Sequence, residues 1–241
     1  MDGFSPSNQD FLSEYRSISG KLKKYVLNLL VPLILNFLHF NFCRRFLRKP
    51  NLSEASDQFS KLAKKVKTNE EPQYEGMCHL AIARCEQNIG NNHGEVEALI
   101  SASRCYLEAE KRIYDLKTPT FNENLTTAIQ SYNHAIRLLE ENGDLTRAAG
   151  LCLELGETLM EMQMRSEALT FYKRATELLP KSSLSYLHAK EKVAKTFVKM
   201  KDYHNAVNVF TDIANSAEQL SRKPATSVTL DILARYCIIT D

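Results

Sequence analysis

Cysteine and histidine, the side chains that most often bind metals, occur six times each in this 241-residue chain. No two cysteines form a C-x-x-C motif, and no histidine lies four residues from another, so no zinc site is predicted. Cys78 and Cys85 lie seven residues apart on one helix face, a spacing typical of buried thiols. We therefore expect reduced cysteines, as in a cytosolic protein, with neither a disulfide framework nor a metal site.

Catalytic motifs are absent from the sequence as well. The eight glycines never stand in a G-x-G-x-x-G or G-x-x-x-x-G-K arrangement, and neither G-x-S-x-G nor H-E-x-x-H occurs. Acidic pairs such as Glu70-Glu71 are expected to be solvated, and His134 is expected to be a solvated helix residue. The sequence thus predicts no catalytic residue, no cofactor and no enzymatic activity.

Charge is unevenly placed along the chain. Residues 1–50 hold eight Lys and Arg against three Asp and Glu, although the net charge of the whole chain is only +2. The remainder is therefore mildly acidic and carries no nucleic-acid footprint. Alternating strand patterns are scarce and 3.6-residue periodicity is frequent, so the chain is predicted to be all-α.

One helical signature is written three times. It sets alanine at i, an aromatic residue at i+4 and a small or apolar residue at i+7, a spacing that lines one helix face. The three copies are Ala128-Tyr132-Ala135, Ala168-Tyr172-Ala175 and Ala206-Phe210-Ile213. A period near 40 residues predicts a right-handed superhelical stack of antiparallel helix pairs, a tetratricopeptide-like solenoid that binds partner proteins.

The middle copy matches nearly a full tetratricopeptide repeat. The matching residues are Cys152, Leu155, Gly156, Leu159, Ala168, Tyr172, Ala175 and Pro180. The alternative is an ordinary helical bundle with alanine-rich seams. Because the spacing exceeds 34 residues, the repeats resemble the longer helical hairpins of soluble NSF-attachment proteins. Helix boundaries are expected at Asn51, Gly90, Gly143 and Asp144, residue types that cap helices.

Residues 25–44 interrupt the pattern. Their core has 18 uncharged residues flanked by basic ones, so read alone it is a candidate membrane segment. Deleting the segment joins Lys24 to Arg45 and continues the apolar stripe of the first helix. Its ends can also be encoded across an intron donor and acceptor. Our hypothesis is a translated in-frame intron, and membrane anchoring is the alternative. The predicted organisation is an N-terminal tail and helix over 1–24, the insert, and a C-terminally truncated repeat domain over 45–241.

Two segments resemble the family of forty-kilodalton huntingtin-associated proteins. They are residues 10–24 and the run Arg45-Phe-Leu-Arg-Lys-Pro50-Asn51, and residues 78–85 and 151–155 add to the likeness. The resemblance implies a tetratricopeptide-like adaptor that binds and stabilises huntingtin, with links to an early-endosomal Rab GTPase and endosome motility. It further implies a cytoplasmic location, with early-endosomal and nuclear pools.

Four residues are candidate partner anchors, because arginine and aromatic residues are enriched at interface hot spots. They are Arg45, Phe46, Arg48 and Lys49. The alternative is that these residues form the solvent-exposed last turn of a helix that ends before Pro50. Two rival functions stay open: an adaptor of the NSF-attachment type that presents SNARE bundles to an ATPase, and a membrane-anchored repeat protein that depends on residues 25–44.

Overall fold

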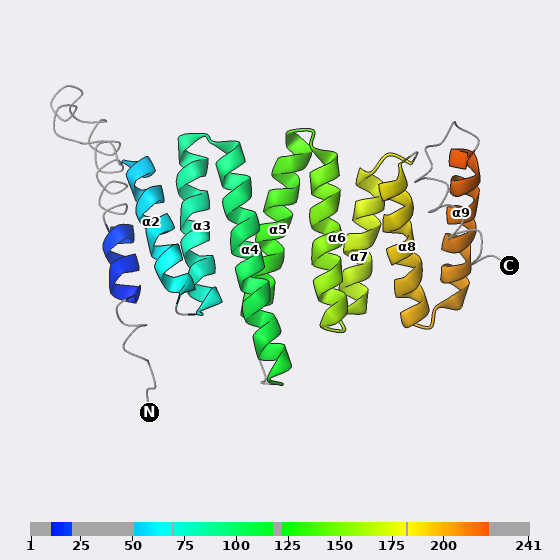
Figure 1. Ribbon diagram of the computed structural model, residues 1–241, viewed down its shortest axis with the longest axis horizontal. Helices are drawn as coiled ribbons and strands as arrows, with labels where there is room; N and C mark the ends of the chain where they lie inside the picture. Colours follow the sequence, from blue (N-terminus) through cyan, green and yellow to red (C-terminus); the bar gives the residue numbers. More distant parts are fainter. Residues whose placement is uncertain (1–10, 21–50, 69, 118–121, 182, 222–241) are drawn as a thin grey trace, which may run out of the picture. The chain divides into compact units, whose positions relative to one another are not determined.

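Every regular element in the described part of the chain is an α-helix, which confirms the all-α prediction (Figure 1). The computed structural model describes residues 11–20, 51–68, 70–117, 122–181 and 183–221. A first helix covers residues 11–20. It is followed by α2 (Leu52–Lys67), α3 (Pro72–Ile89), α4 (Asn92–Asp115), α5 (Glu123–Glu141), α6 (Leu145–Glu161), α7 (Arg165–Leu178), α8 (Leu184–Lys199) and α9 (Tyr203–Ser221).

The chain divides into two compact units, Met1–Ser131 and Tyr132–Asp241. In the first unit α3 packs against both α2 and α4, and in the second α7 packs against α6 and α8, while α8 also packs against α9. Within each unit, these consecutive helices are therefore neighbours in space, as in stacked helical hairpins. The handedness of the superhelix stays a prediction.

Helix ends coincide with the capping residues expected from sequence. Asn51 Oδ1 accepts a hydrogen bond from the Glu54 amide at 3.2 Å, and Asp144 Oδ1 accepts one from the Arg147 amide at 3.1 Å. Gly90 ends α3 in the left-handed region at φ +82°, where a residue without Cβ fits most easily. These capping residues mark where one helix ends and the next begins.

The alanine seams are the most deeply buried parts of the structure. Ala128, Tyr132, Ala168 and Ala175 are all 0 % exposed. The third signature copy departs from this pattern, because Phe210 is only half-buried. Its neighbours Ala206 and Ile213, at 2 % and 1 % exposure, form the buried seam there.

The predicted insert and the final apolar segment, Val228 to Ile239, both lie outside the described residues. Among the helices that are described, none is long and apolar enough to cross a membrane. The intron and membrane hypotheses for residues 25–44 therefore stay predictions.

Candidate functional site: an interaction groove

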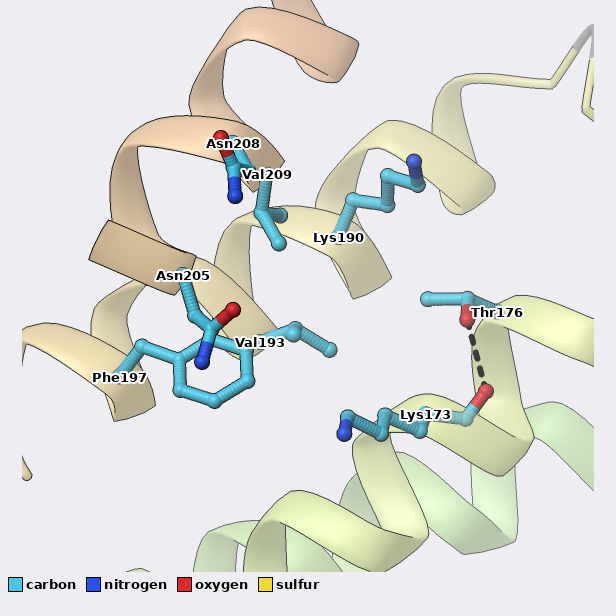
Figure 2. A pocket seen from close by; sticks show the side chains of 8 residues that line it. All are labelled: Lys173, Thr176, Lys190, Val193, Phe197, Asn205, Asn208 and Val209. Atoms are coloured by element: carbon cyan, nitrogen blue, oxygen red, sulfur yellow. Dashed lines mark hydrogen bonds between the residues drawn. The ribbon is translucent and has the colours of Figure 1, made fainter. Parts of the chain in front are cut away.

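A groove in the second unit is the leading candidate for partner binding (Figure 2). It has a volume of about 300 Å³ and is lined by side chains from three helices. These are Lys173 and Thr176 of α7, Lys190, Val193 and Phe197 of α8, and Asn205, Asn208 and Val209 of α9. In Figure 2 the α8 side chains lie between those of α7 and those of α9.

The floor of the groove is apolar. Val193 and Phe197 lie four residues apart on α8 and are 5 % and 8 % exposed. Lys173 Nζ lies 5.3 Å from the centre of the Phe197 ring, a cation–π distance. One turn along α7, the Thr176 hydroxyl donates to the Lys173 carbonyl at 2.7 Å. A positive charge thus stands over an aromatic surface.

A second cation, Lys190, is held in place by two neighbours. Its ammonium donates to Asp212 Oδ2 at 2.8 Å and lies 5.4 Å from the centre of the Tyr186 ring. Burial opposes the charge on Lys190, but the hydrogen bonds with Asp212 and Tyr186 outweigh it and raise the pKa of the ammonium. Lys190 therefore stays charged in neutral solution, although its side chain is only 18 % exposed.

The opposite wall comes from α9. Asn205 and Asn208 are both exposed, and the Asn205 amide donates to Asp202 Oδ2 at 2.6 Å, which fixes it at the start of the helix. The lining residues include no carboxylate, histidine or cysteine. The groove is therefore suited to noncovalent binding of a segment that offers a carboxylate next to an apolar side chain.

The predicted partner anchors Arg45, Phe46, Arg48 and Lys49 lie outside the described residues. Sequence reasoning also missed the groove. Its residues are spread over a span of 36 positions, from Lys173 to Val209, and share no motif. Only the packing of three helices brings them together. The recurring signature located the buried faces of α7 and α9 but not the polar residues beside them.

The predicted contacts of the best-matching repeat lie together in the second unit. Leu155 and Gly156 of α6 and Tyr172 of α7 are all buried. A Cβ built on Gly156 would lie 2.5 Å from Tyr172 Cε1, so the ring lies directly on the backbone of α6. Only glycine permits so close an approach.

A further copy of the signature lies in α4, and helical periodicity in the sequence predicts that its three residues face the core. Ala102, Tyr106 and Ala109 stand at i, i+4 and i+7 and are 0 %, 7 % and 3 % exposed. A Cβ on Gly76 of α3 would lie 2.9 Å from Tyr106 Cε2. The pair Gly76 and Tyr106 therefore plays the part in the first unit that Gly156 and Tyr172 play in the second.

The four cysteines that the structure describes are buried free thiols. They are Cys78, Cys85, Cys105 and Cys152. Burial raises the pKa of Cys78, Cys105 and Cys152 to about 12, so these thiols are protonated at neutral pH. Ligand atoms of Glu75, His79 and Cys105 all lie within 4.8 Å of one another, a grouping that the sequence spacing did not predict.

The family model of soluble NSF attachment proteins matches residues 42–223. The chain belongs to this family. Two relatives are both named 40-kDa huntingtin-associated protein. The protein from Rattus norvegicus is 35% identical over 218 residues, which cover 89% of this chain and 52% of the relative. The one from Mus musculus is 34% identical over 224 residues, covering 92% and 54%. The chain thus spans about half the length of the curated relatives it matches.

Two solved structures match the chain at low similarity. MamA protein is 15% identical with a TM-score of 0.36, covering 73% of this chain and 88% of its own. BtubC from P. vanneervenii is 11% identical with a TM-score of 0.45, covering 92% and 95%. At these TM-scores neither protein says anything further about this chain. The names of the family and of the two relatives refer to attachment or association, and none of them names a reaction.

Proposed function

We propose that this chain is a non-enzymatic helical adaptor that binds and stabilises huntingtin. The observation that carries the proposal is the match to two huntingtin-associated proteins over about nine-tenths of the chain. The groove between α7, α8 and α9 offers a surface suited to protein binding, since it combines an apolar floor with two lysines. Because the relatives are about twice as long, the proposal requires that the half they share with this chain is sufficient for the contact.

Co-expression with full-length huntingtin tests the proposal directly. We expect the chain to co-elute with huntingtin from a size-exclusion column, and a chain that elutes alone would refute huntingtin as partner. Lys173→Glu reverses the charge over the apolar floor and should weaken the complex about tenfold, a hot-spot effect. Lys181→Glu is the matched control, because Lys181 is exposed and lies outside the groove. Equal binding by both variants would show that the contact lies on another surface.

The likeness to these relatives also motivates a location. We propose that the adaptor is cytoplasmic, that an early-endosomal Rab GTPase links part of it to early endosomes, and that a further pool is nuclear. Imaging of the tagged chain with an endosomal marker tests this proposal, and loss of the endosomal signal on depletion of the GTPase is the expected result. A signal that is unchanged by the depletion would exclude the GTPase.

A second candidate function is supported by the match to the family model over residues 42–223. On this proposal the chain acts as an NSF-attachment adaptor and presents SNARE bundles to the ATPase. Stimulation of NSF ATPase activity by the purified chain in the presence of SNARE complex would favour it. Huntingtin binding without any stimulation would favour the first proposal. The membrane-anchored alternative depends on residues 25–44 and is tested by membrane fractionation with and without them.

A further inference from the structure

A second groove, in the first unit, holds a cluster of side chains that the adaptor function does not use. It has a volume of about 590 Å³ and is lined by α2, α3 and α4. Glu75 and His79 stand one helical turn apart on α3, with Glu75 Oε1 and His79 Nε2 3.7 Å from each other. Cys105 reaches the same point from α4, so that one ligand atom from each residue lies within 4.8 Å of the others.

The three residue types match the requirements of one class of metal. Carboxylate oxygen, imidazole nitrogen and thiolate sulfur are the ligands of zinc, whereas calcium and magnesium prefer oxygen alone. Bonds of 2.0–2.3 Å in a tetrahedral site place ligand atoms about 3.5 Å apart. The Glu75–His79 separation of 3.7 Å already approaches that value. A carboxylate and a thiolate together also balance the charge of a divalent ion.

We propose that Glu75, His79 and Cys105 form a binding site for a zinc-class divalent transition metal ion. A tetrahedral ion needs a fourth ligand. A water can supply that ligand, because Glu108, which lines the same groove, is paired with Arg112 at 2.6 Å. The site joins α3 to α4, so a bound ion would clamp the hairpin that the Gly76–Tyr106 contact already closes.

Protons compete with the metal for the ligand atoms, so low pH weakens metal binding. Burial lowers the pKa of His79, so its imidazole is neutral and able to bind a metal near pH 7. Burial, and then the charge of Glu75, raise the pKa of Cys105 to about 12. The metal must therefore displace the thiol proton, and binding tightens as pH rises.

Charged and titratable groups from all three helices face this cluster. They are Lys64 and Lys67 of α2, Glu75, Cys78 and His79 of α3, and Arg104, Cys105 and Glu108 of α4. Lys67 Nζ lies 3.8 Å from Glu75 Oε1, one of the proposed ligand atoms. Its side chain is 74 % exposed, so it can turn into solvent when an ion binds. Its charge nevertheless opposes the ion.

Cobalt(II) titration of the metal-free full chain tests the proposal. We expect a thiolate-to-cobalt charge-transfer band that saturates at one equivalent and is displaced by Zn²⁺. Cys105→Ser should abolish the band, and His79→Gln should raise the Kd at least about tenfold. Cys152→Ser is the matched control, since Cys152 is an equally buried thiol in the second unit with a pKa also raised to about 12. This variant should keep the band.

A surface variant provides a test that does not depend on whether the ligand variants fold. Lys67→Met removes an exposed charge and should lower the Kd about two- to fivefold, the effect of one weak surface ion pair. The absence of a charge-transfer band in the folded wild-type chain would overturn the proposal. A band that persists in Cys105→Ser would do so as well, because another thiol would then be the ligand.

Discussion

The ring of Tyr172 lies so close to Gly156 that a Cβ added to the glycine would approach the ring carbon Cε1 to 2.5 Å. Real side chains do not come this near, so the contact depends on the missing Cβ. Both residues are buried, and they lie on consecutive helices, α6 and α7. The contact therefore sets how closely this hairpin closes.

Gly156→Ala should destabilise the chain by about 1–3 kcal/mol, because the added methyl group overpacks the seam. Gly150→Ala is the control, since it lies on the same helix with no atom within 4 Å of its Cβ position. That change should stabilise by up to about 1 kcal/mol through helix propensity. Urea unfolding measures both. In a Tyr172→Leu background Gly156→Ala should cost less, and an unchanged cost would show that the ring is not the obstacle.

Gly76→Ala should destabilise the first unit for the same reason, but by less. The nearest ring atoms of Tyr106 would lie at 2.9, 3.0 and 3.2 Å, so a smaller displacement of the ring relieves the overlap. We expect about 1 kcal/mol, the lower end of overpacking costs. Thermal unfolding of the two alanine variants side by side checks the order. A larger effect at Gly76 than at Gly156 would contradict this interpretation.

Tyr132→Phe should destabilise the second unit by about 1.5–3 kcal/mol. The Tyr132 hydroxyl donates to Glu154 Oε1 at 2.9 Å, and the side chain has no exposed surface. Hydrogen bonds to charged groups contribute more than neutral ones, and the change leaves the ring in place. Denaturant unfolding provides the measurement. Tyr132→Ala, which also removes the ring, should cost about 3–5 kcal/mol, whereas a cost near zero for Tyr132→Phe would argue against the hydrogen bond.

Stability should fall as pH rises above about 9. Burial raises the pKa of Cys78, Cys105 and Cys152 from 9.0 to about 12. The folded chain thus keeps thiol protons that the unfolded chain releases, and deprotonation favours unfolding between about pH 9 and 12. Urea midpoints measured from neutral to alkaline pH should decline over this window. Cys152→Ala should reduce the decline, and a flat profile would show that these thiols titrate normally.

Helix ends and the repeat seam could be predicted because each depends on residues close in sequence. Gly90 and Asp144 cap their helices whatever lies around them, and Ala168, Tyr172 and Ala175 share a face by helical spacing alone. The copy at Ala102 has the same spacing, but its contact with a glycine could not be predicted from that spacing. Its glycine partner, Gly76, precedes Tyr106 by 30 residues, whereas Gly156 precedes Tyr172 by 16, because the α3–α4 hairpin is longer.

Neither groove could be predicted from sequence, since each needs three helices to pack. The i,i+4 pair Glu75 and His79 is visible in the sequence, but nothing there places Cys105 beside it. The position of Lys173 over Phe197 likewise follows from the packing of α7 on α8. The anchors Arg45 and Arg48 were chosen from residue type and resemblance, and they lie outside the described residues.

The groove of the second unit is lined by residues of α7, α8 and α9. Stability in repeat proteins is local, so the α8–α9 hairpin can unfold transiently while α6 and α7 remain intact. A partner that fills the groove binds only the closed hairpin and must therefore slow that opening. Backbone amide hydrogen exchange in α9 should therefore slow when the groove is occupied. This slowing should include Asn205 and Asn208, although their side chains are exposed.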